Sequence, residues 1–391
     1  MLGQGVSLLG SMITTVALPV QMYALTGSTV AVGLVGLAEL LPIVALALLS
    51  GALADAFDRR RLIQLAEVLS LLTVLGLLAN ALLPAPHTAV LYVAAALLAA
   101  ALAIQRPPRD SLLPRLVRRE ELISASAVYG AVGYAARLAG PALGGVLIAA
   151  AGAAAAYAVD AATFAVALAS LAAMQTAPPP PDAAPPSLRG VLESARYARS
   201  RQELIGTYLV DMNAMFFAMP EALFPAVANR HGGAAVAGVF FAAPAAGGLA
   251  LVLVSGWTRR VRRHGRAVVL AAMGWGAGIA LFGAAHSVWP AVAGLVLAGA
   301  MDEVSGIFRA TIWYQTIPDR LRGRMAGLEM LSWSSGPTLG NVEAGFAAAL
   351  VGLRTSIVAG GALCVLGSAA LAVALPRFWH YEALPADPRA G

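Results

Sequence analysis

Charged side chains lie inside several long apolar stretches of this 391-residue sequence. A charge near the middle of a bilayer costs about 2.5 to 3.5 kcal/mol even on an insertion scale, so such residues mark proton relays, substrate sites or ion pairs. Burial raises the pKa of a carboxylate and a nearby arginine lowers it, so a carboxylate that alternates between these environments can bind and release a proton. We predict proton coupling or substrate binding for Asp211, Glu39, Glu343, Arg137, Asp302 and Glu303. The alternative for each is an ion pair that only orients helices, and the acid that meets Arg137 is left open.

Asp211 is the acid for which we expect a position near the middle of a span. It follows an apolar run and precedes Asn213 and the aromatic pair Phe216 and Phe217. Desolvation would favour its protonated form, so a cationic or hydrogen-bonding substrate could compete with the proton. Glu67 lies only one to two turns from the end of a span, where we expect a solvated or loop-paired side chain.

The composition indicates that these charges belong to a membrane protein. Hydrophobic residues make up 59% of the chain and charged residues 12%, with a mean hydropathy of +0.77; soluble chains average about 25% charged residues. The histidines lie in loops or the tail without metal-ligand spacing, and the single Cys364 excludes an intramolecular disulfide. The chain has no lysine and therefore no lysine-containing phosphate loop. We expect no enzyme, no metal site and no cofactor.

The apolar stretches divide into twelve candidate spans of about 20 residues or more. They are 2–25, 30–54, 62–83, 88–105, 122–150, 153–175, 203–228, 235–256, 267–285, 289–310, 325–350 and 352–375. All 26 basic residues are arginine, and those after even-numbered spans far outnumber Arg230 and Arg354, which follow odd-numbered spans. Because basic loops remain cytoplasmic, we predict that both termini are cytoplasmic. The net charge of +6 then reflects topology, and no nucleic-acid partner is expected.

A repeated glycine–proline string predicts two related halves. The string at 140–144 recurs at 336–340, an offset of 337 minus 141, or 196 residues. Small residues allow helices to approach closely and proline permits a kink, so we predict a helix-packing role for Gly140, Pro141, Gly144, Gly336, Pro337 and Gly340.

The predicted organisation has two bundles, a linker and a tail. The bundles comprise 1–175 and 203–375, the cytoplasmic linker 176–202, and the cytoplasmic tail 376–391. The linker is rich in proline, which favours extended chain, and it ends in a short amphipathic segment. That segment either lies on the inner membrane surface or covers the ends of the bundles.

The loop between the second and third spans carries a recognisable motif. Its string Gly51-Ala-Leu-Ala-Asp55-Ala-Phe-Asp58-Arg59-Arg60-Arg61 resembles the loop motif of the major facilitator superfamily, with Asp58 in place of the second glycine. The corresponding loop in the second half, at 256–260, keeps glycine and arginines without the aspartate. Arginine- and proline-containing loops at 106–122 and 315–324 are similar to those of a bacterial branch of siderophore and drug exporters.

This resemblance implies an all-α integral membrane fold of twelve transmembrane helices in two pseudo-symmetric six-helix bundles. It further implies alternating access, proton antiport and export of an amphipathic organic solute, such as a siderophore or drug, across a bacterial inner membrane. A monomer is expected. Asp55, together with Gly51, Arg59 and Arg60, would form a gate that bridges the halves. The alternatives are uptake or uncoupled transport, or a lipid scramblase or membrane partner on the same scaffold.

The resemblance also assigns the candidate residues to helices with different roles. The first, fourth, seventh and tenth helices line the cavity in this superfamily, which favours Asp211, Asp302 and Glu303. The second, fifth, eighth and eleventh form gates, which suits Glu39, Arg137 and Glu343. Aromatic surfaces suit bulky amphipathic ligands, although they also serve as lipid-facing side chains or interfacial belts. The predicted cavity lining comprises Tyr208, Asn213, Phe216, Phe217 and Trp333.

Overall fold

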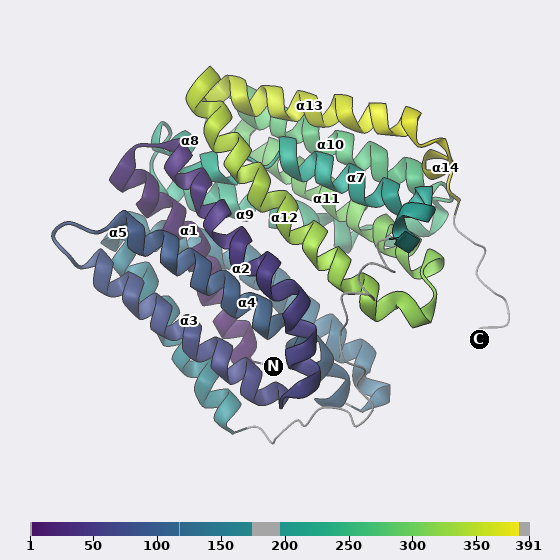
Figure 1. The fold of residues 1–391 in the computed structure, drawn as a ribbon. Coiled ribbons are helices and arrows are strands. Elements are labelled where there is room, and N and C mark those ends of the chain that lie inside the picture. The colour runs from purple at the N-terminus through teal and green to yellow at the C-terminus, as the bar shows by residue number, and fades with distance from the viewer. Residues whose placement is uncertain (1, 117, 174–195, 383–391) are drawn as a thin grey trace.

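A computed structural model describes residues 2–116, 118–173 and 196–382. This part of the chain consists of helices and their connections, and it contains no strand. The helices form two bundles that lie side by side, the first from α1 to α5 and the second from α7 to α14 (Figure 1). The prediction of an all-α fold in two bundles is therefore confirmed over the described residues.

The first bundle contains long helices around a mainly aliphatic core. They are α1 (Leu2–Thr26), α2 (Thr29–Ala56), α3 (Arg59–Ala81), α4 (Thr88–Leu116) and α5 (Leu122–Ala172), with the short η1 (Arg119–Glu121) before α5. Val74, Leu77 and Tyr157 are fully buried in its core. Gly152 interrupts the helical geometry of α5 with φ 77° and ψ 175°, a conformation that glycine adopts readily because it has no Cβ. The predicted spans 122–150 and 153–175 are the two parts of this interrupted helix.

The second bundle has an aromatic core. Its long helices are α7 (Gln202–Phe217), α9 (Ala234–Leu253), α10 (His264–Ala284), α11 (Val288–Thr316), α12 (Asp319–Val351) and α13 (Leu353–Ala374), and its short ones η2 (Glu221–Leu223), α8 (Phe224–Asn229), η3 (Ser255–Arg260) and α14 (Pro376–Trp379). Phe224, Phe240 and Phe282 make edge contacts with centroids 5.2 to 6.0 Å apart. The predicted span 203–228 is divided, because α7 ends at Phe217 and η2 follows Pro220, which has no N–H for a helix.

Nine helices of the described chain are long and apolar enough to cross a membrane. The interrupted α5 counts as one of them, and the divided α7–α8 segment is not included. The chain therefore has the multi-pass architecture that its composition predicts. The count of twelve spans stays a prediction.

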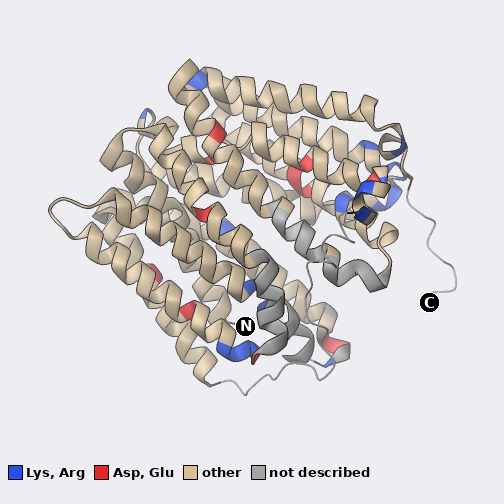
Figure 2. Cartoon of the chain, viewed as in Figure 1, with Lys and Arg blue, Asp and Glu red and all other residues tan. Residues whose placement is uncertain are grey.

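Most basic residues lie toward one end of the molecule, whereas several acidic residues lie along the helices (Figure 2). We call this the arginine-rich end; it is the end at which α2 meets α3 and α9 meets α10. Asp58 lies there as the N-cap of α3, and its side chain accepts a hydrogen bond from the Arg61 N–H at 3.2 Å. The residue that replaces the motif's second glycine therefore starts the next helix.

Arg60 links the start of α3 to the end of α5. Its Nε and Nη2 donate to the main-chain oxygens of Leu171 and Ala172 at 3.0 and 2.8 Å. A guanidinium suits this position because the last carbonyls of a helix lack intrahelical partners and carry partial negative charge. Gly51 and Asp55 lie within α2, and the Asp55 side chain is outside the described residues.

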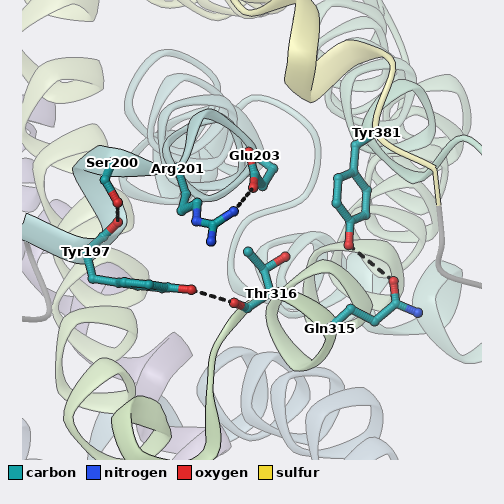
Figure 3. Close-up of polar contacts among 7 residues, drawn as sticks. All are labelled: Tyr197, Ser200, Arg201, Glu203, Gln315, Thr316 and Tyr381. Atoms are coloured by element: carbon teal, nitrogen blue, oxygen red, sulfur yellow. Dashed lines mark hydrogen bonds and ion pairs between the residues drawn. The ribbon is translucent and has the colours of Figure 1, made fainter.

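The end of the predicted linker attaches to the last turn of α11 (Figure 3). The Tyr197 hydroxyl donates to the main-chain oxygen of Thr316 at 2.8 Å, and Arg201 forms an ion pair with Glu203 at 3.6 Å. From the other side, the Tyr381 hydroxyl donates to Gln315 at 3.2 Å. Most of the predicted linker lies outside the described residues, and the predicted domain limits stay predictions.

Candidate transport site

The glycines of the two repeated strings pack against corresponding helices, α1 in the first bundle and α7 in the second. A β-carbon at Gly144 on α5 would lie 3.1 Å from the main-chain oxygen of Ile13 on α1. At Gly336 on α12 it would lie 3.0 Å from the Cβ of Met215 on α7. The other string glycines, Gly140 and Gly340, approach the same two helices more closely still. Each string thus allows close packing against the first helix of its own bundle.

Glycines also bring the two bundles together away from the arginine-rich end. A β-carbon at Gly33, near the start of α2, would lie 2.7 Å from the main-chain oxygen of Asn341 on α12. A β-carbon at Gly145 on α5 would lie 2.8 Å from the Cα of Gly238, near the start of α9. No larger side chain fits at these positions unless the helices separate. We call these two contacts the closed end.

A cavity of about 350 Å³ lies between the bundles. This volume is at the small end of the range for organic ligand sites. The first bundle supplies most of its wall, and the second contributes Glu221, Ala222, Phe241 and Asn341. The charged residues on its wall are Glu39, Arg109, Asp160 and Glu221.

Asp160 is a buried acid on this wall with hydroxyl partners from two threonines. It is 1% exposed, and its two carboxylate oxygens accept hydrogen bonds from Thr14 at 2.5 Å and Thr163 at 3.2 Å. Both hydroxyl donors reduce the cost of burying a carboxylate. This arrangement joins α1 to the second part of α5.

Glu67 is the main departure from the sequence-based expectations for the acids. We expected a solvated or loop-paired side chain, yet Glu67 is fully buried. It accepts hydrogen bonds from Gln105 at 2.6 Å, Ser7 at 3.1 Å and Gln4 at 3.3 Å, and the charge of Arg109 acts on it. Position along a span does not show which face a side chain presents; the polar residues on α1 and α4 create the buried site.

The second bundle contains a charge cluster around Arg309. Arg309 on α11 forms an ion pair with buried Asp211 on α7, and its Nη2 lies 3.7 Å from Asp302. The Asp211 side chain is 10% exposed, whereas that of Asp302 is 47% exposed. A cavity of about 10 Å³, enough for roughly one water molecule, borders both acids.

The role of Arg309 was not predicted from the sequence. The available signal was its spacing from Asp302, seven residues or about two helical turns, which puts both side chains on one face of α11. The pairing of Arg309 with Asp211 could not be inferred from spacing within one helix, because that contact depends on how α7 and α11 pack.

Glu303 connects this region to the first bundle. Its Oε2 accepts a hydrogen bond of 2.6 Å from the Tyr134 hydroxyl on α5. Arg137, one turn further along α5, is exposed, and its charge acts on Asp302. Within the described residues Arg137 forms no ion pair with an acid.

The sequence of this chain fits one transporter family over almost its whole length. The family described as transmembrane secretion effector, within the major facilitator superfamily, matches residues 2–389. The chain belongs to this family. The family assignment agrees with the resemblance carried by the loop motif and supports a membrane transporter rather than an enzyme.

Relatives of known name support the same conclusion, and the solved structure of another protein supports the fold. The enterobactin exporter EntS of Citrobacter koseri is 29% identical over 355 residues, covering 90% of this chain and 85% of the relative. EntS of Escherichia coli K12 is 29% identical over 373 residues, covering 95% and 89%. A mutant of the nucleoside transporter NupG is similar in structure, with a TM-score of 0.78, 11% identity and coverage of 95% and 99%. The transporter is thus a multi-pass protein of the bacterial inner membrane.

Four residues of the predicted cavity lining, Tyr208, Asn213, Phe216 and Phe217, are not among the described residues that line the 350 Å³ cavity. Tyr208 makes an edge contact with Trp313 at 5.0 Å, and Asn213 donates to the main-chain oxygen of Cys364 on α13 at 2.9 Å. Phe216 and Phe217 contact each other with centroids 5.0 Å apart. The Trp333 side chain is outside the described residues. Glu343 on α12 is half-buried and does not line either cavity.

Proposed function

We propose that this transporter is a secondary-active exporter that moves an amphipathic organic solute, such as a siderophore or drug, outward in exchange for protons. It works as a monomer by alternating access. The observation that carries the proposal is the 350 Å³ cavity between two bundles that touch at the closed end. The relatives are named as enterobactin exporters, which supports both the direction of transport and the substrate class.

The contacts between the bundles favour alternating access. At the closed end the bundles meet through close backbone approaches between small residues, such as Gly145 and Gly238, and through a hydrogen bond of 3.0 Å from the Thr29 hydroxyl to the main-chain oxygen of Gly345. Such contacts can separate with little loss of hydrophobic core, because most buried apolar residues of each bundle pack within that bundle. Rocking of the two bundles would open the closed end and close the arginine-rich end.

The charge cluster of the second bundle favours proton coupling. Arg309 is shared between a buried acid, Asp211, and a more exposed one, Asp302. A proton that neutralises Asp211 releases Arg309 toward Asp302, and loss of the proton restores the first ion pair. The two protonation states therefore stabilise different arrangements of α7 and α11, as coupling requires.

The orientation of the bundles gives a prediction that can be tested with cysteine labelling. On a Cys364→Ser background, a membrane-impermeant maleimide should label Arg354→Cys in intact cells, because basic loops remain cytoplasmic and Arg354 lies at the opposite end. Arg260→Cys should be labelled only after permeabilisation. The closed end lies opposite the arginine-rich end, so this topology places it at the outer face. Labelling of position 260 from outside would reverse the topology and place the closed end at the inner face.

Transport itself is tested in proteoliposomes that contain a pH-sensitive dye. With an acidic lumen, metal-free enterobactin or ethidium should accumulate inside, and the lumen should become more alkaline as protons leave in exchange. The same vesicles without protein provide the background. Accumulation without any change in lumenal pH would exclude proton antiport.

The alternative functions predict other results in the same vesicles. An uncoupled transporter would equilibrate the solute without accumulating it, and a scramblase would move a fluorescent lipid without an ion gradient. Either result, with no gradient-driven accumulation of solute, would contradict the proposed function.

A further inference from the structure

Two acids from different bundles line the 350 Å³ cavity and have no hydrogen-bond or ion-pair partner among the residues that the structure describes. Glu39 belongs to α2 in the first bundle and Glu221 to η2 in the second, and both line the cavity. Within the described residues neither accepts a hydrogen bond or forms an ion pair. Both are half-buried, and the charge of Glu221 acts on Glu39.

The remaining charges on the cavity wall have partners. Asp160 accepts hydrogen bonds from Thr14 and Thr163. The charge of Arg109 acts on Glu67, and its guanidinium lies 5.6 Å from the centre of the Tyr129 ring. Among the described charged residues on this wall, Glu39 and Glu221 therefore have carboxylates that are available to bind a ligand.

Asn341 fixes the place of Glu221 in the cavity. Its Oδ1 accepts a hydrogen bond of 2.9 Å from the Ala222 N–H, and it lines the cavity itself. The main-chain oxygen of Asn341 is also the atom that Gly33 approaches at the closed end. The two acids thus come together where α2, η2 and α12 meet.

We propose that Glu39 and Glu221 bind the positively charged group of an amphipathic organic cation, so that the cavity selects cationic over anionic solutes. This inference rests on the proposed export function and names the substrate class of the same cavity. Two carboxylates in an apolar surrounding attract a cation strongly, because water screens the interaction poorly there. The opposite side of the ligand would contact apolar residues such as Leu98, Phe164 and Phe241.

The placement of the acids also relates binding to the transport cycle. One carboxylate belongs to each bundle, so the cation bridges the bundles only while Glu39 and Glu221 lie near each other. Opening of the closed end would move α2 away from η2 and divide the site. Release would then follow from loss of one carboxylate.

Two probes of similar shape and opposite charge test this inference. The purified full-length protein in detergent is titrated with tetraphenylphosphonium and, separately, with tetraphenylborate, and binding is measured by calorimetry. Tetraphenylphosphonium should bind and tetraphenylborate should not. Glu39→Gln and Glu221→Gln should each weaken cation binding by about tenfold or more, a change of about 1.4 kcal/mol per factor of ten. Glu39→Asp, which keeps the charge, should retain most of the affinity.

Glu121→Gln is the matched control. Glu121 lies outside the spans in an exposed ion pair with Arg118, which lowers the pKa of its carboxyl and keeps it ionised during the assay. This variant should bind tetraphenylphosphonium like the parent protein. Gel filtration establishes that every variant is folded and monodisperse.

The inference would be overturned by equal binding of both probes, or by folded Glu39→Gln and Glu221→Gln variants with parental affinity. If metal-free enterobactin is still accumulated in proteoliposomes in that case, the export function stands and only the cation preference fails. If no solute is accumulated while the cation binds as described, the cavity site stands and the export function fails.

Discussion

Asp211→Asn is expected to abolish proton-driven accumulation of substrate while leaving passive exchange. Asparagine resembles the protonated acid, so the site is held in one protonation state and the ion pair with Arg309 cannot form. Arg309 retains Asp302 as a partner, which limits the loss of stability. Accumulation in proteoliposomes with an acidic lumen should fall to the equilibrium value, and exchange of labelled substrate without a gradient should continue.

Arg309→Gln is expected to lower the stability of the protein more than Asp211→Asn does. It leaves Asp211 buried without its cation, and removal of one partner from a buried pair costs about 3 to 5 kcal/mol. Its melting temperature in detergent should therefore fall well below that of Asp211→Asn. If Asp211→Asn still concentrates substrate with normal pH dependence, coupling belongs elsewhere, and Glu39 and then Glu343 become the candidates.

Gly145→Leu is expected to block transport by holding the closed end apart. A β-carbon at Gly145 would already lie 2.8 Å from the Cα of Gly238 and 2.7 Å from the main-chain oxygen of Ala234. Both neighbours are backbone atoms, which cannot move aside by a change of rotamer, so α5 and α9 must separate. The cavity should then be reachable from the side of the closed end. On a Cys364→Ser background, Thr15→Cys on the cavity wall should be labelled by an impermeant maleimide from that side.

Gly76→Leu is the matched control for this variant. Gly76 lies within α3, and a β-carbon there would meet nothing within 4 Å. Transport and labelling of Thr15→Cys should both remain as in the parent. The Gly145→Leu variant could instead transport like the parent and leave Thr15→Cys unlabelled by the maleimide. That result would show that the Gly145–Gly238 contact does not close the cavity.

The sequence determined the class of this protein because that information is local. Hydrophobic composition, the spacing of apolar stretches and the arginine loops predicted a helical membrane protein, and the family match confirms the major facilitator assignment. The motif around Gly51 and Asp55 carried the family resemblance without any knowledge of packing. The helix break at Gly152 likewise falls between two predicted spans. Glycine and proline act on the backbone of their own segment, which makes their effects readable from sequence.

Polar partners were decided only by the tertiary structure. Asp211 was recognised as a candidate acid, but its pairing with Arg309 depends on the rotation of α7 and α11 about their axes. The burial of Glu67 depends on side chains from α1 and α4. Hydrophobic periodicity could not assign these faces, because a helix surrounded by lipid and by other helices is apolar on every side.

The juxtaposition of the two bundles was the least predictable feature. Glu39 and Glu221 are separated by most of the first bundle and the linker in sequence, yet they line one cavity. Asn213, expected on the cavity wall, donates instead to α13. The sequence determined which residues carry charge and which segments are apolar enough to cross a membrane. Helix packing decided which charges meet, since a shift of a single residue turns a side chain by about 100° around its helix.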